Sequence, residues 1–380
     1  MAENKQVIYF DHAATTKPLP EVGALYSEVI NTYYANPSSV HQLGIDNNRL
    51  LEGARKEILA SLGMKDHQVI FTSGATESNN LALKGYMHRY KNRGKHLIVS
   101  AIEHPSVLNT VNTLMKEGFD VSFIPVDEHG KVSLKRIREE LKESTILVSI
   151  MAINNEVGAI EPIKEIAEFF KQFPNIRLHV DAVQAVGKID LPYNDIDLLT
   201  ISMHKLGGLK GSGLLIKRKI IEFIPIQDGG GHEYGYRSGT NDLAAAVVSN
   251  FVLKRALKDV MDKRIQVAEL ARKLYEYFSS KKDDVAINSL IENPYIINIS
   301  LLRKKASVFA EFLSNNGIMV STHSACSSRV DSGSPTLKAM GKNDVICKNA
   351  IRISLSTTNT IEEVNRFIEV FDFGLKRLKG

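Results

Sequence analysis

Side chains with chemical potential recur directly after short apolar runs of this sequence. Lys205 follows the run Leu198–Ser202, and a lysine desolvated in a ligand crevice becomes a nucleophilic amine. Asp181 ends the run Arg177–Asp181, where its carboxylate could hold a cationic ring nitrogen. Both residues also have ordinary interpretations, a surface ion pair for the lysine and a helix cap for the aspartate. Their shared position predicts a ligand site beyond the ends of strands.

Two further clusters occupy similar positions. The stretch Thr72–Asn80, TSGATESNN, follows a strand and opens a helix, so its free N–H groups and hydroxyls could bind a phosphate. An ordinary capped helix explains the same residues equally well. His104 follows Glu103, and its imidazole could stack on a planar ring or move a proton. Taken alone, His104 favours a structural role.

The two cysteines differ in their surroundings. Cys326 lies in the small, polar segment Ser321–Ser334, which predicts an exposed thiol whose thiolate is favoured by Arg329 or His323. Cys347 precedes a strand beside Ile346 and is interpreted as inert packing. Two cysteines exclude a disulfide framework and a multi-cysteine metal site, and we expect no metal.

Composition sets broad limits on the protein class. A chain of 380 residues predicts two domains. The 48 basic and 43 acidic residues leave a net charge of +5, which favours neither nucleic acid nor an anionic membrane as the main partner. The sequence shows no signal peptide and no apolar run of membrane-spanning length, so we expect a cytoplasmic protein.

Strand and helix patterns alternate through the first two thirds of the chain, which predicts a mostly parallel sheet with helices on both faces. After about Asp242 one or two long helices, up to Ser280, precede a smaller α+β domain. The predicted strands are Gln68–Thr72, His96–Ser100, Asp120–Pro125, Ile146–Ile150, Arg177–Asp181, Leu198–Ser202, Gly213–Lys217, Ile296–Ser300, Ile318–Ser321 and Ala350–Ser354. The other predicted helices are Leu50–Leu62, Leu81–Tyr90, Pro105–Lys116, Leu134–Leu141, Pro162–Phe173, Lys305–Asn315, Pro335–Met340 and Ile361–Lys376.

Together and in this order the clusters resemble the cysteine desulfurases of the NifS/IscS type, which are fold-type I enzymes that use pyridoxal 5′-phosphate (PLP). The resemblance runs nearly end to end. It is carried by YFDHAATT (Tyr9–Thr16), NPSSVH (Asn36–His41), TSGATESNN, EHPSV (Glu103–Val107), NNEVG around Asn155, DAVQAVGK (Asp181–Lys188), SMHKLGGLKGSG (Ser202–Gly213), YRSGT (Tyr236–Thr240), SACSS (Ser324–Ser328) and IRISLS (Ile351–Ser356).

The resemblance implies an α/β fold of PLP-dependent transferase type I. Its large domain, residues 15–258, would hold a mostly parallel seven-stranded sheet, and residues 1–14 and 259–380 would form the small domain with the cysteine loop. It also implies the site residues. Lys205 would be the Schiff-base lysine, His104 would stack on the ring and help move protons, and Cys326 would be the nucleophile. The remaining roles are Asp181 and Gln184 at the ring, Ala75, Thr76, Ser202 and His204 at the phosphate, Thr240 at the phosphate of a neighbouring subunit, and Asn155 with Arg352 at the substrate carboxylate.

The implied reaction removes sulfur from L-cysteine, giving L-alanine and a persulfide on Cys326. A homodimer is implied by Thr240, and a protein sulfur acceptor, either an iron–sulfur scaffold or a tRNA-thiolating enzyme, would receive the sulfur. Two enzyme alternatives are a selenocysteine lyase and a small-amino-acid aminotransferase, although an aminotransferase needs no thiol. A catalytically inactive sulfur-transfer scaffold is a third, but it has no need of Lys205, Asp181, His104 and Cys326 together.

Overall fold

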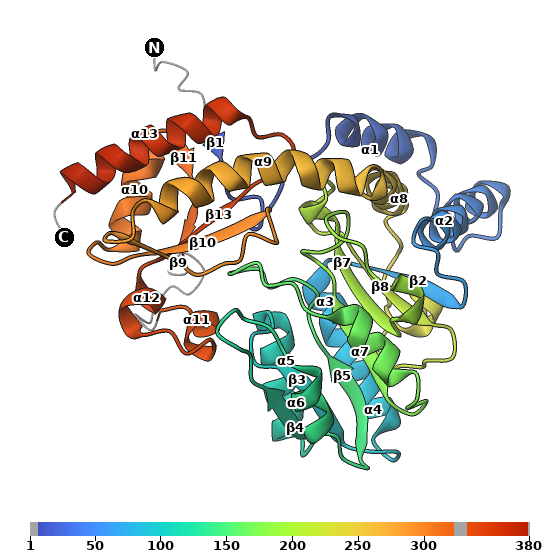
Figure 1. Ribbon diagram of the computed structural model, residues 1–380. Helices are drawn as coiled ribbons and strands as arrows, with labels where there is room; N and C mark the ends of the chain where they lie inside the picture. The colour runs from blue at the N-terminus through green and yellow to red at the C-terminus, as the bar shows by residue number, and fades with distance from the viewer. Residues whose placement is uncertain (1–6, 323–332, 379–380) are drawn as a thin grey trace.

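The computed structural model describes residues 7–322 and 333–378 and contains the predicted seven-stranded sheet (Figure 1). All seven sequence-predicted strands of the large domain are confirmed to within one or two residues. The strand order is β2 (His67–Thr72), β8 (Gly213–Arg218), β7 (Leu198–Ser202), β6 (Arg177–Asp181), β5 (Thr145–Ser149), β3 (His96–Ser100) and β4 (Asp120–Ile124).

The strands of this sheet run mostly in one direction. The pairs β3–β4, β3–β5, β5–β6 and β6–β7 are parallel, whereas β8 lies antiparallel to both β7 and β2. Strand β2 therefore has the same direction as β7. The carboxyl ends of six strands meet at one edge, which is where α/β folds bind ligands.

Side chains on alternate residues of each strand enter two different cores. Ile98 and Val148 belong to the larger core, while their neighbours Leu97 and Leu147 belong to a second core on the other face. Covering both faces excludes water from the sheet, as the near-continuous apolar strands require. The larger core takes side chains from α6 (Leu134–Glu139) and α7 (Ile163–Phe170); the second takes them from α5 (Pro105–Lys116), a π-helical turn η1 (Leu81–Gly85) and α4 (Tyr86–Tyr90).

The C-terminal part builds a second, four-stranded antiparallel sheet. Its order is β12 (Ser321–Thr322), β13 (Ala350–Ser354), β10 (Ile296–Leu301) and β9 (Val285–Ile287). The remaining helices are α1 (Pro20–Thr32), α2 (Gln42–Ser61), α3 (Ala75–Asn80), α8 (Leu243–Leu257), α9 (Val260–Ser279), α10 (Ala306–Asn315), α11 (Pro335–Ala339), α12 (Asp344–Lys348) and α13 (Ile361–Arg377), with 3₁₀ turns η2 (Tyr193–Asp195), η3 (Met203–Lys205) and η4 (Glu233–Gly235).

Several predicted boundaries are wrong for identifiable reasons. The predicted strand Ile318–Ser321 is divided between β11 (Ile318–Met319), which pairs with β1 (Ile8–Tyr9), and β12, which joins the second sheet. Pro162 is the residue before α7 instead of its first residue. Helix α2 begins at Gln42 because the His41 side chain accepts the N–H of Gly44, eight residues before the predicted start at Leu50.

The N-terminal segment connects the two sheets. Strand β1 pairs in parallel with β11, and Asp11 forms an isolated bridge with Ser354 of β13. A few residues later, Thr16 Oγ1 donates to the carbonyl of His204 and accepts the N–H of Gly207. This short segment therefore carries backbone groups to the ligand-binding edge of the large sheet.

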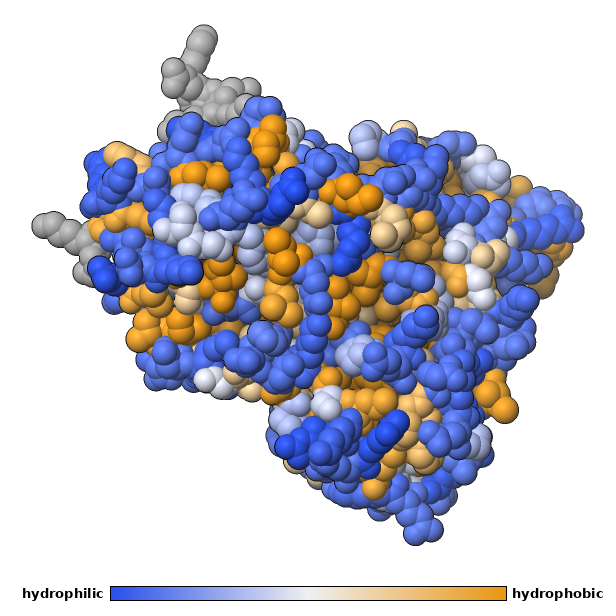
Figure 2. Space-filling model, in the orientation of Figure 1, coloured by the Kyte–Doolittle hydropathy of each residue, from blue (hydrophilic) through white to orange (hydrophobic). Residues whose placement is uncertain are grey.

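Figure 2 shows a face on which hydrophilic residues dominate and apolar residues emerge chiefly in the central part. Among residues 7–322 and 333–378, no helix is long and apolar enough to cross a membrane. The domain boundaries at residues 14/15 and 258/259 stay a prediction.

A buried ion pair fixes the segment around η4 against β2. Arg55 of α2 donates through Nη1 and Nη2 to Glu233 at 2.7 and 2.6 Å, and the two side chains are 6% and 1% exposed. Glu233 also accepts the N–H of Phe71 at 2.8 Å, and the Arg55 guanidinium lies 4.8 Å from the Phe71 ring centre. This bidentate geometry is the strong form of an arginine–carboxylate pair.

We expect Arg55→Met to lower the free energy of unfolding by about 3–5 kcal/mol, because it leaves the buried Glu233 charge unpaired. Urea unfolding followed by circular dichroism measures the change. The exposed pair between Arg49 and Asp46 on the same helix is the control, and Arg49→Ala should change stability by less than about 1 kcal/mol. An Arg55→Met variant as stable as the Arg49→Ala variant would contradict the assignment.

Candidate active site

The predicted site residues gather at the carboxyl-terminal edge of the large sheet. Asp181 is the last residue of β6, Lys205 ends the 3₁₀ turn that follows β7, and His104 lies four residues after β3. Arg352 comes from β13 of the second sheet. The site is therefore assembled from both sheets and from the N-terminal segment between them.

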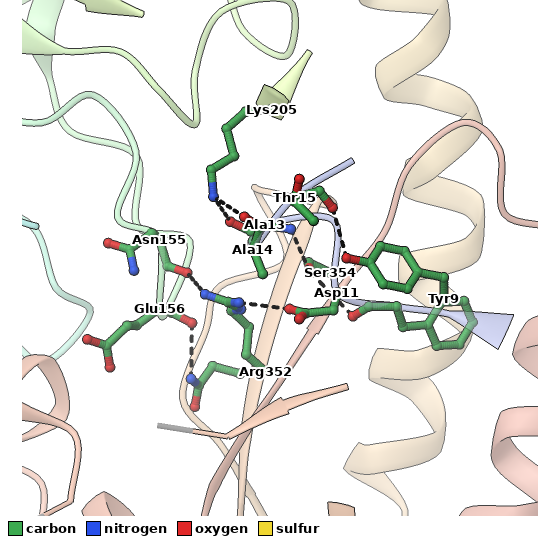
Figure 3. Close-up of polar contacts among 12 residues, drawn as sticks. Tyr9, Asp11, Ala13, Ala14, Thr15, Asn155, Glu156, Lys205, Arg352 and Ser354 are labelled. Carbon is green, nitrogen blue, oxygen red and sulfur yellow. Dashed lines mark hydrogen bonds and ion pairs between the residues drawn. The ribbon is translucent and has the colours of Figure 1, made fainter. Parts of the chain in front are cut away.

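The amine of Lys205 is held by backbone oxygens. Its Nζ donates to the carbonyls of Ala13 and Ala14 at 2.5 and 2.6 Å (Figure 3). Both acceptors belong to the segment that Thr16 docks against the loop after η3. Both of these acceptors are neutral carbonyls, and they orient the amine.

The carbonyl of Ala13 is shared with Gln184, whose Nε2 donates to it at 2.9 Å. The other end of this amide, Oε1, accepts from Lys188 at 3.0 Å. Burial lowers the pKa of Lys188 to about 7, and repulsion by Lys205 and Arg352 acts in the same direction. The site thus concentrates positive charge near the Lys205 amine.

Asp181 is a buried carboxylate, 4% exposed. Its Oδ2 accepts from Asn79 Nδ2 at 2.8 Å and its Oδ1 accepts the N–H of Val183 at 3.0 Å. Within the described parts of the chain, no ion pair involves Asp181. A buried carboxylate with only neutral donors is suited to a cationic ligand, since burying an unpaired charge is costly.

His104 caps the N-terminus of α5. Its Nδ1 accepts the N–H of Ser106 at 3.1 Å and lies 2.9 Å from Ser106 Oγ. The ring is exposed at the site, and no hydrogen bond to Nε2 is formed by the residues described. Next to it, the buried Glu103 carboxyl accepts the N–H of Met151 at 2.7 Å, and burial raises its pKa well above the usual value.

The residues expected at a phosphate lie around the start of α3. Ala75 and Thr76 begin this helix. Its N-cap residue, Gly74, approaches β8 so closely that a Cβ on Gly213 would lie 2.6 Å from the Cα of Gly74. His204 Nδ1 is 3.0 Å from Thr15 Oγ1, and burial lowers the pKa of His204 to about 4, so its ring is neutral at pH 7. Ser202 is buried at the end of β7.

Arg352 and Asn155 are brought together, but through the backbone of Asn155. Arg352 Nη1 donates to the Asn155 carbonyl at 2.9 Å, and Nη2 pairs with Asp11 Oδ1 at 2.8 Å (Figure 3). Arg352 Nε is buried and has no hydrogen-bond partner among the described residues. Asp11 therefore orients a guanidinium that retains unused donors for an anion.

Cys326 lies outside the described residues, but the flanking chain is placed. On one side, Ser321 of β12 pairs with Arg352 in β13. On the other, Ser334 Oγ donates to Glu156 Oε2 at 2.5 Å, one residue after Asn155. One flank is therefore paired with the strand that carries Arg352, and the other is bonded to the residue after Asn155.

The remaining sequence predictions have clear positions. Thr240 is exposed and makes no hydrogen bond with the described residues, although the nearby Arg237 pairs with Glu77 of α3 at 2.8 Å. Cys347 is fully buried in α12, its thiol donates to the Lys342 carbonyl at 3.4 Å, and burial raises its pKa, as expected for packing.

A cavity of about 390 Å³ adjoins the site. Of the predicted site residues that the structure describes, only Lys205 lines this cavity. Basic side chains, including Lys17, Lys188 and Arg255, dominate its charged lining. It lies beside the constellation of Asp181 and His104 and does not contain it, so we place the chemistry at the strand ends and not in this cavity.

Three contributors to the site were not identified from the sequence. Asp11 and Asn79 lie in the quoted stretches YFDHAATT and TSGATESNN, which were recognised as landmarks without roles for these residues. Ser106 lies in EHPSV and is linked to both His104 and Asn79. Each of these three residues is a polar side chain within a recognised motif, and this was the signal from which a role in the site could have been predicted.

Comparisons with known proteins identify the family of this chain. The model of the class-V aminotransferase family matches residues 8–367. A NifS/IcsS protein homolog from Lactobacillus delbrueckii subsp. bulgaricus is 39% identical over 371 residues, covering 96% of each chain. Cysteine desulfurase IscS 1 from Archaeoglobus fulgidus is 38% identical over 377 residues, covering 98% of each chain.

Solved structures of NifS-like proteins are also similar to this chain. A NifS-like protein superposes with a TM-score of 0.90 at 34% identity, covering 98% of this chain and all of the other. A NifS-like protein from Rickettsia africae superposes with a TM-score of 0.85 at 30% identity. The family match and the superposition on NifS-like structures confirm the fold-type I prediction, and the class-V aminotransferases and cysteine desulfurases are families of PLP enzymes. The chain therefore belongs to the class-V aminotransferase family and, within it, to the cysteine desulfurases of the NifS/IscS type.

Proposed function

We propose that this enzyme binds PLP at the strand ends and transfers the sulfur of L-cysteine to Cys326, releasing L-alanine. The observation that carries the proposal is the buried Asp181 carboxylate, which has only neutral donors and lies at the same sheet edge as the Lys205 amine. A pyridinium nitrogen is a cation that could pair with the Asp181 carboxylate, and an aldehyde could form an imine with the Lys205 amine.

Each residue then has a role toward the cofactor, which supplies an electron sink when bound. Lys205 would attach it covalently and move the α-proton of the substrate. Asp181 would hold the ring nitrogen, Gln184 would donate near the ring, and His104 would lie against its face. The phosphate would be held by Ala75, Thr76, Ser202 and the neutral His204.

Arg352 and Asn155 would bind the carboxylate of the amino acid. Asp11 and the Asn155 carbonyl each occupy one donor of the guanidinium, so a substrate carboxylate can take others in a bidentate pair. Asn155 turns its backbone carbonyl to the guanidinium (Figure 3). This arrangement supports an α-amino acid as the substrate class.

The sulfur step balances with one thiol on the enzyme. The carbon–sulfur bond of L-cysteine breaks, a sulfur–sulfur bond forms at the Cys326 thiolate, and protons return to the carbon skeleton to give L-alanine. Cys326 is four residues from Thr322, so it can reach at most about 14 Å from that residue. The pairing of Ser321 with Arg352 supports its access to the substrate.

The proposal includes a homodimer and a protein sulfur acceptor. Between α1 and α2, Tyr34 is 75% and Val40 is 93% exposed, and burial of such side chains in a subunit interface would be favourable. Thr240 is exposed on the chain segment that Arg237 ties to α3, which agrees with a role toward a second subunit. The acceptor would be an iron–sulfur scaffold or a tRNA-thiolating enzyme.

The decisive experiment incubates the PLP-loaded enzyme with L-cysteine and a dithiol reductant and quantifies sulfide and alanine together. We expect the two products in equal amounts. A 2-oxo acid formed without sulfide would instead identify an aminotransferase. Faster turnover of L-selenocysteine, with negligible turnover of L-cysteine, would identify a selenocysteine lyase.

Arg352→Lys is expected to lower kcat/KM for L-cysteine by about 10- to 100-fold, mainly through KM, because lysine lacks the planar fork that pairs with a carboxylate. Steady-state sulfide release measures the effect. Arg303→Lys, at an exposed position of the same domain, is the control and should retain wild-type kinetics. Unchanged KM in Arg352→Lys would place the carboxylate elsewhere.

A further inference from the structure

A chain of hydrogen bonds links Asp181 to His104 through two residues with no assigned role. Asn79 Nδ2 donates to Asp181 Oδ2 and to Ser106 Oγ, each at 2.8 Å. Ser106 Oγ lies 2.9 Å from His104 Nδ1. Asn79 is fully buried and Ser106 is 8% exposed, so water does not compete with these contacts.

The donor directions in this chain follow from its two ends. A carboxylate accepts, so the NH₂ group of Asn79 faces Asp181, and its second hydrogen points to Ser106 Oγ. The backbone N–H of Ser106 donates to His104 Nδ1 at 3.1 Å, which makes this nitrogen an acceptor. The Ser106 hydroxyl, which accepts from Asn79, therefore donates its own proton to Nδ1. Two donors therefore meet at Nδ1.

A nitrogen that accepts from two donors carries no proton. The neutral ring of His104 must then have its proton on Nε2, the nitrogen that the described residues leave without a hydrogen bond. In this state Nε2 can donate but cannot accept a proton. Charging the ring would place an N–H at Nδ1 against the N–H of Ser106.

We propose that Ser106 and Asn79 are positioning residues that hold His104 as the neutral tautomer protonated on Nε2, so that His104 enters the reaction as a hydrogen-bond donor and not as a base. The proton-accepting role toward the substrate then belongs to Lys205. The part of this proposal that concerns the reaction rests on the proposed function, whereas the tautomer is a property of the protein itself.

The charged groups around His104 agree with a neutral ring. Desolvation is the largest influence and lowers the pKa of His104; Asp181 raises it, Lys205 lowers it and Glu156 raises it, and the net result is a pKa below the usual value. The hydrogen bonds to Nδ1 act in the same direction, since they stabilise only the neutral form.

The first measurement is the tautomer and pKa of His104 by ¹⁵N–¹H NMR of histidine-labelled full-length protein, both cofactor-free and PLP-loaded. A His104→Gln variant identifies the signals. We expect a proton on Nε2 at neutral pH. Ser106→Ala should raise the pKa of His104 by about half to one unit. Thr110→Val, which removes a buried hydroxyl bonded to the Ser106 carbonyl on the same helix, should leave it unchanged.

Asn79→Asp is a second, nearly isosteric variant. An acceptor at residue 79 would turn the Ser106 hydroxyl away from Nδ1, so the pKa of His104 should rise further and the Nδ1–H tautomer should appear. Wild-type protein with its proton on Nδ1 at neutral pH would overturn the proposal. So would an unchanged tautomer and pKa in both Ser106→Ala and Asn79→Asp.

The kinetic measurement is the pH dependence of α-proton exchange of L-cysteine in deuterated buffer. If neutral His104 is the active form, the acid limb of the profile should move to higher pH in Ser106→Ala by the same interval as the NMR pKa. An acid limb that stays at its wild-type pH in Ser106→Ala, although the NMR pKa has shifted, would show that His104 does not act as a donor in this step. If the expected tautomer is observed but L-cysteine is not turned over, the proposed function is rejected and the tautomer assignment stands.

Discussion

Lys205→Ala is expected to lower turnover of L-cysteine by about 10⁴-fold or more, since the proposed function assigns to Lys205 both the covalent attachment of the cofactor and the removal of the α-proton. The variant should also lose cofactor attachment that survives borohydride reduction, which mass spectrometry detects. Ala13 and Ala14 hold the amine at the sheet edge by two short hydrogen bonds. Neighbouring amines are engaged elsewhere, Lys188 with Gln184.

Lys210→Ala is the matched control for this experiment. Lys210 is exposed in the loop that follows Lys205, so its removal should leave both turnover and cofactor attachment in place. Folding of the Lys205→Ala variant is checked by its thermal unfolding. Wild-type turnover in a folded Lys205→Ala protein would show that another group forms the covalent link.

Cys326→Ala is expected to reduce the formation of sulfide and alanine by about 10³-fold or more, a loss of the size seen when a covalent nucleophile is removed. In the proposed function this thiol accepts the sulfur of the substrate, so the bond between sulfur and carbon should stay intact without it. Exchange of the α-proton with deuterated solvent should persist, because Lys205 is intact. The two readouts separate sulfur transfer from the earlier proton step.

Cys347→Ala provides the control for the thiol. This second cysteine is fully buried, and its thiol bonds to the Lys342 carbonyl, so its replacement should lower stability modestly and preserve turnover. After a single turnover without reductant, one additional sulfur atom should be found on Cys326 in wild-type and Cys347→Ala protein. Sulfide release at the wild-type rate by Cys326→Ala would reject the persulfide step.

The sequence predicted the sheet well because its signal is local. Runs such as His96–Ser100 and Leu198–Ser202 are apolar on both faces, as buried parallel strands must be, and their bounds are confirmed. Helix α1 was not predicted, because only Val22 and Val29 are fully buried and much of its apolar surface remains exposed. The strand at 318–321 was misassigned because strand pairing is a long-range property.

The site was predictable as a set of side chains but not as a set of contacts. Lys205 and Asp181 were found from their position after strands, and the structure places them at one sheet edge. The acceptors of Lys205 are backbone carbonyls, which carry no residue signature. The bond between Asn79 and Asp181 joins positions 102 residues apart, a distance in sequence that no local pattern spans.

The docking of the N-terminal segment between the sheets has a consequence for the order of synthesis. Asp11 meets Arg352, its partner 341 positions later, and β1 completes its pairing only with β11. At roughly 5–20 residues per second, the ribosome needs about 20 s or more to span that interval. Until then the carbonyls that orient Lys205 are not locked against the second sheet. The lysine environment is therefore completed only after β11 and β13 have been synthesised, and a chain that stops short of β13 leaves Asp11 without its partner.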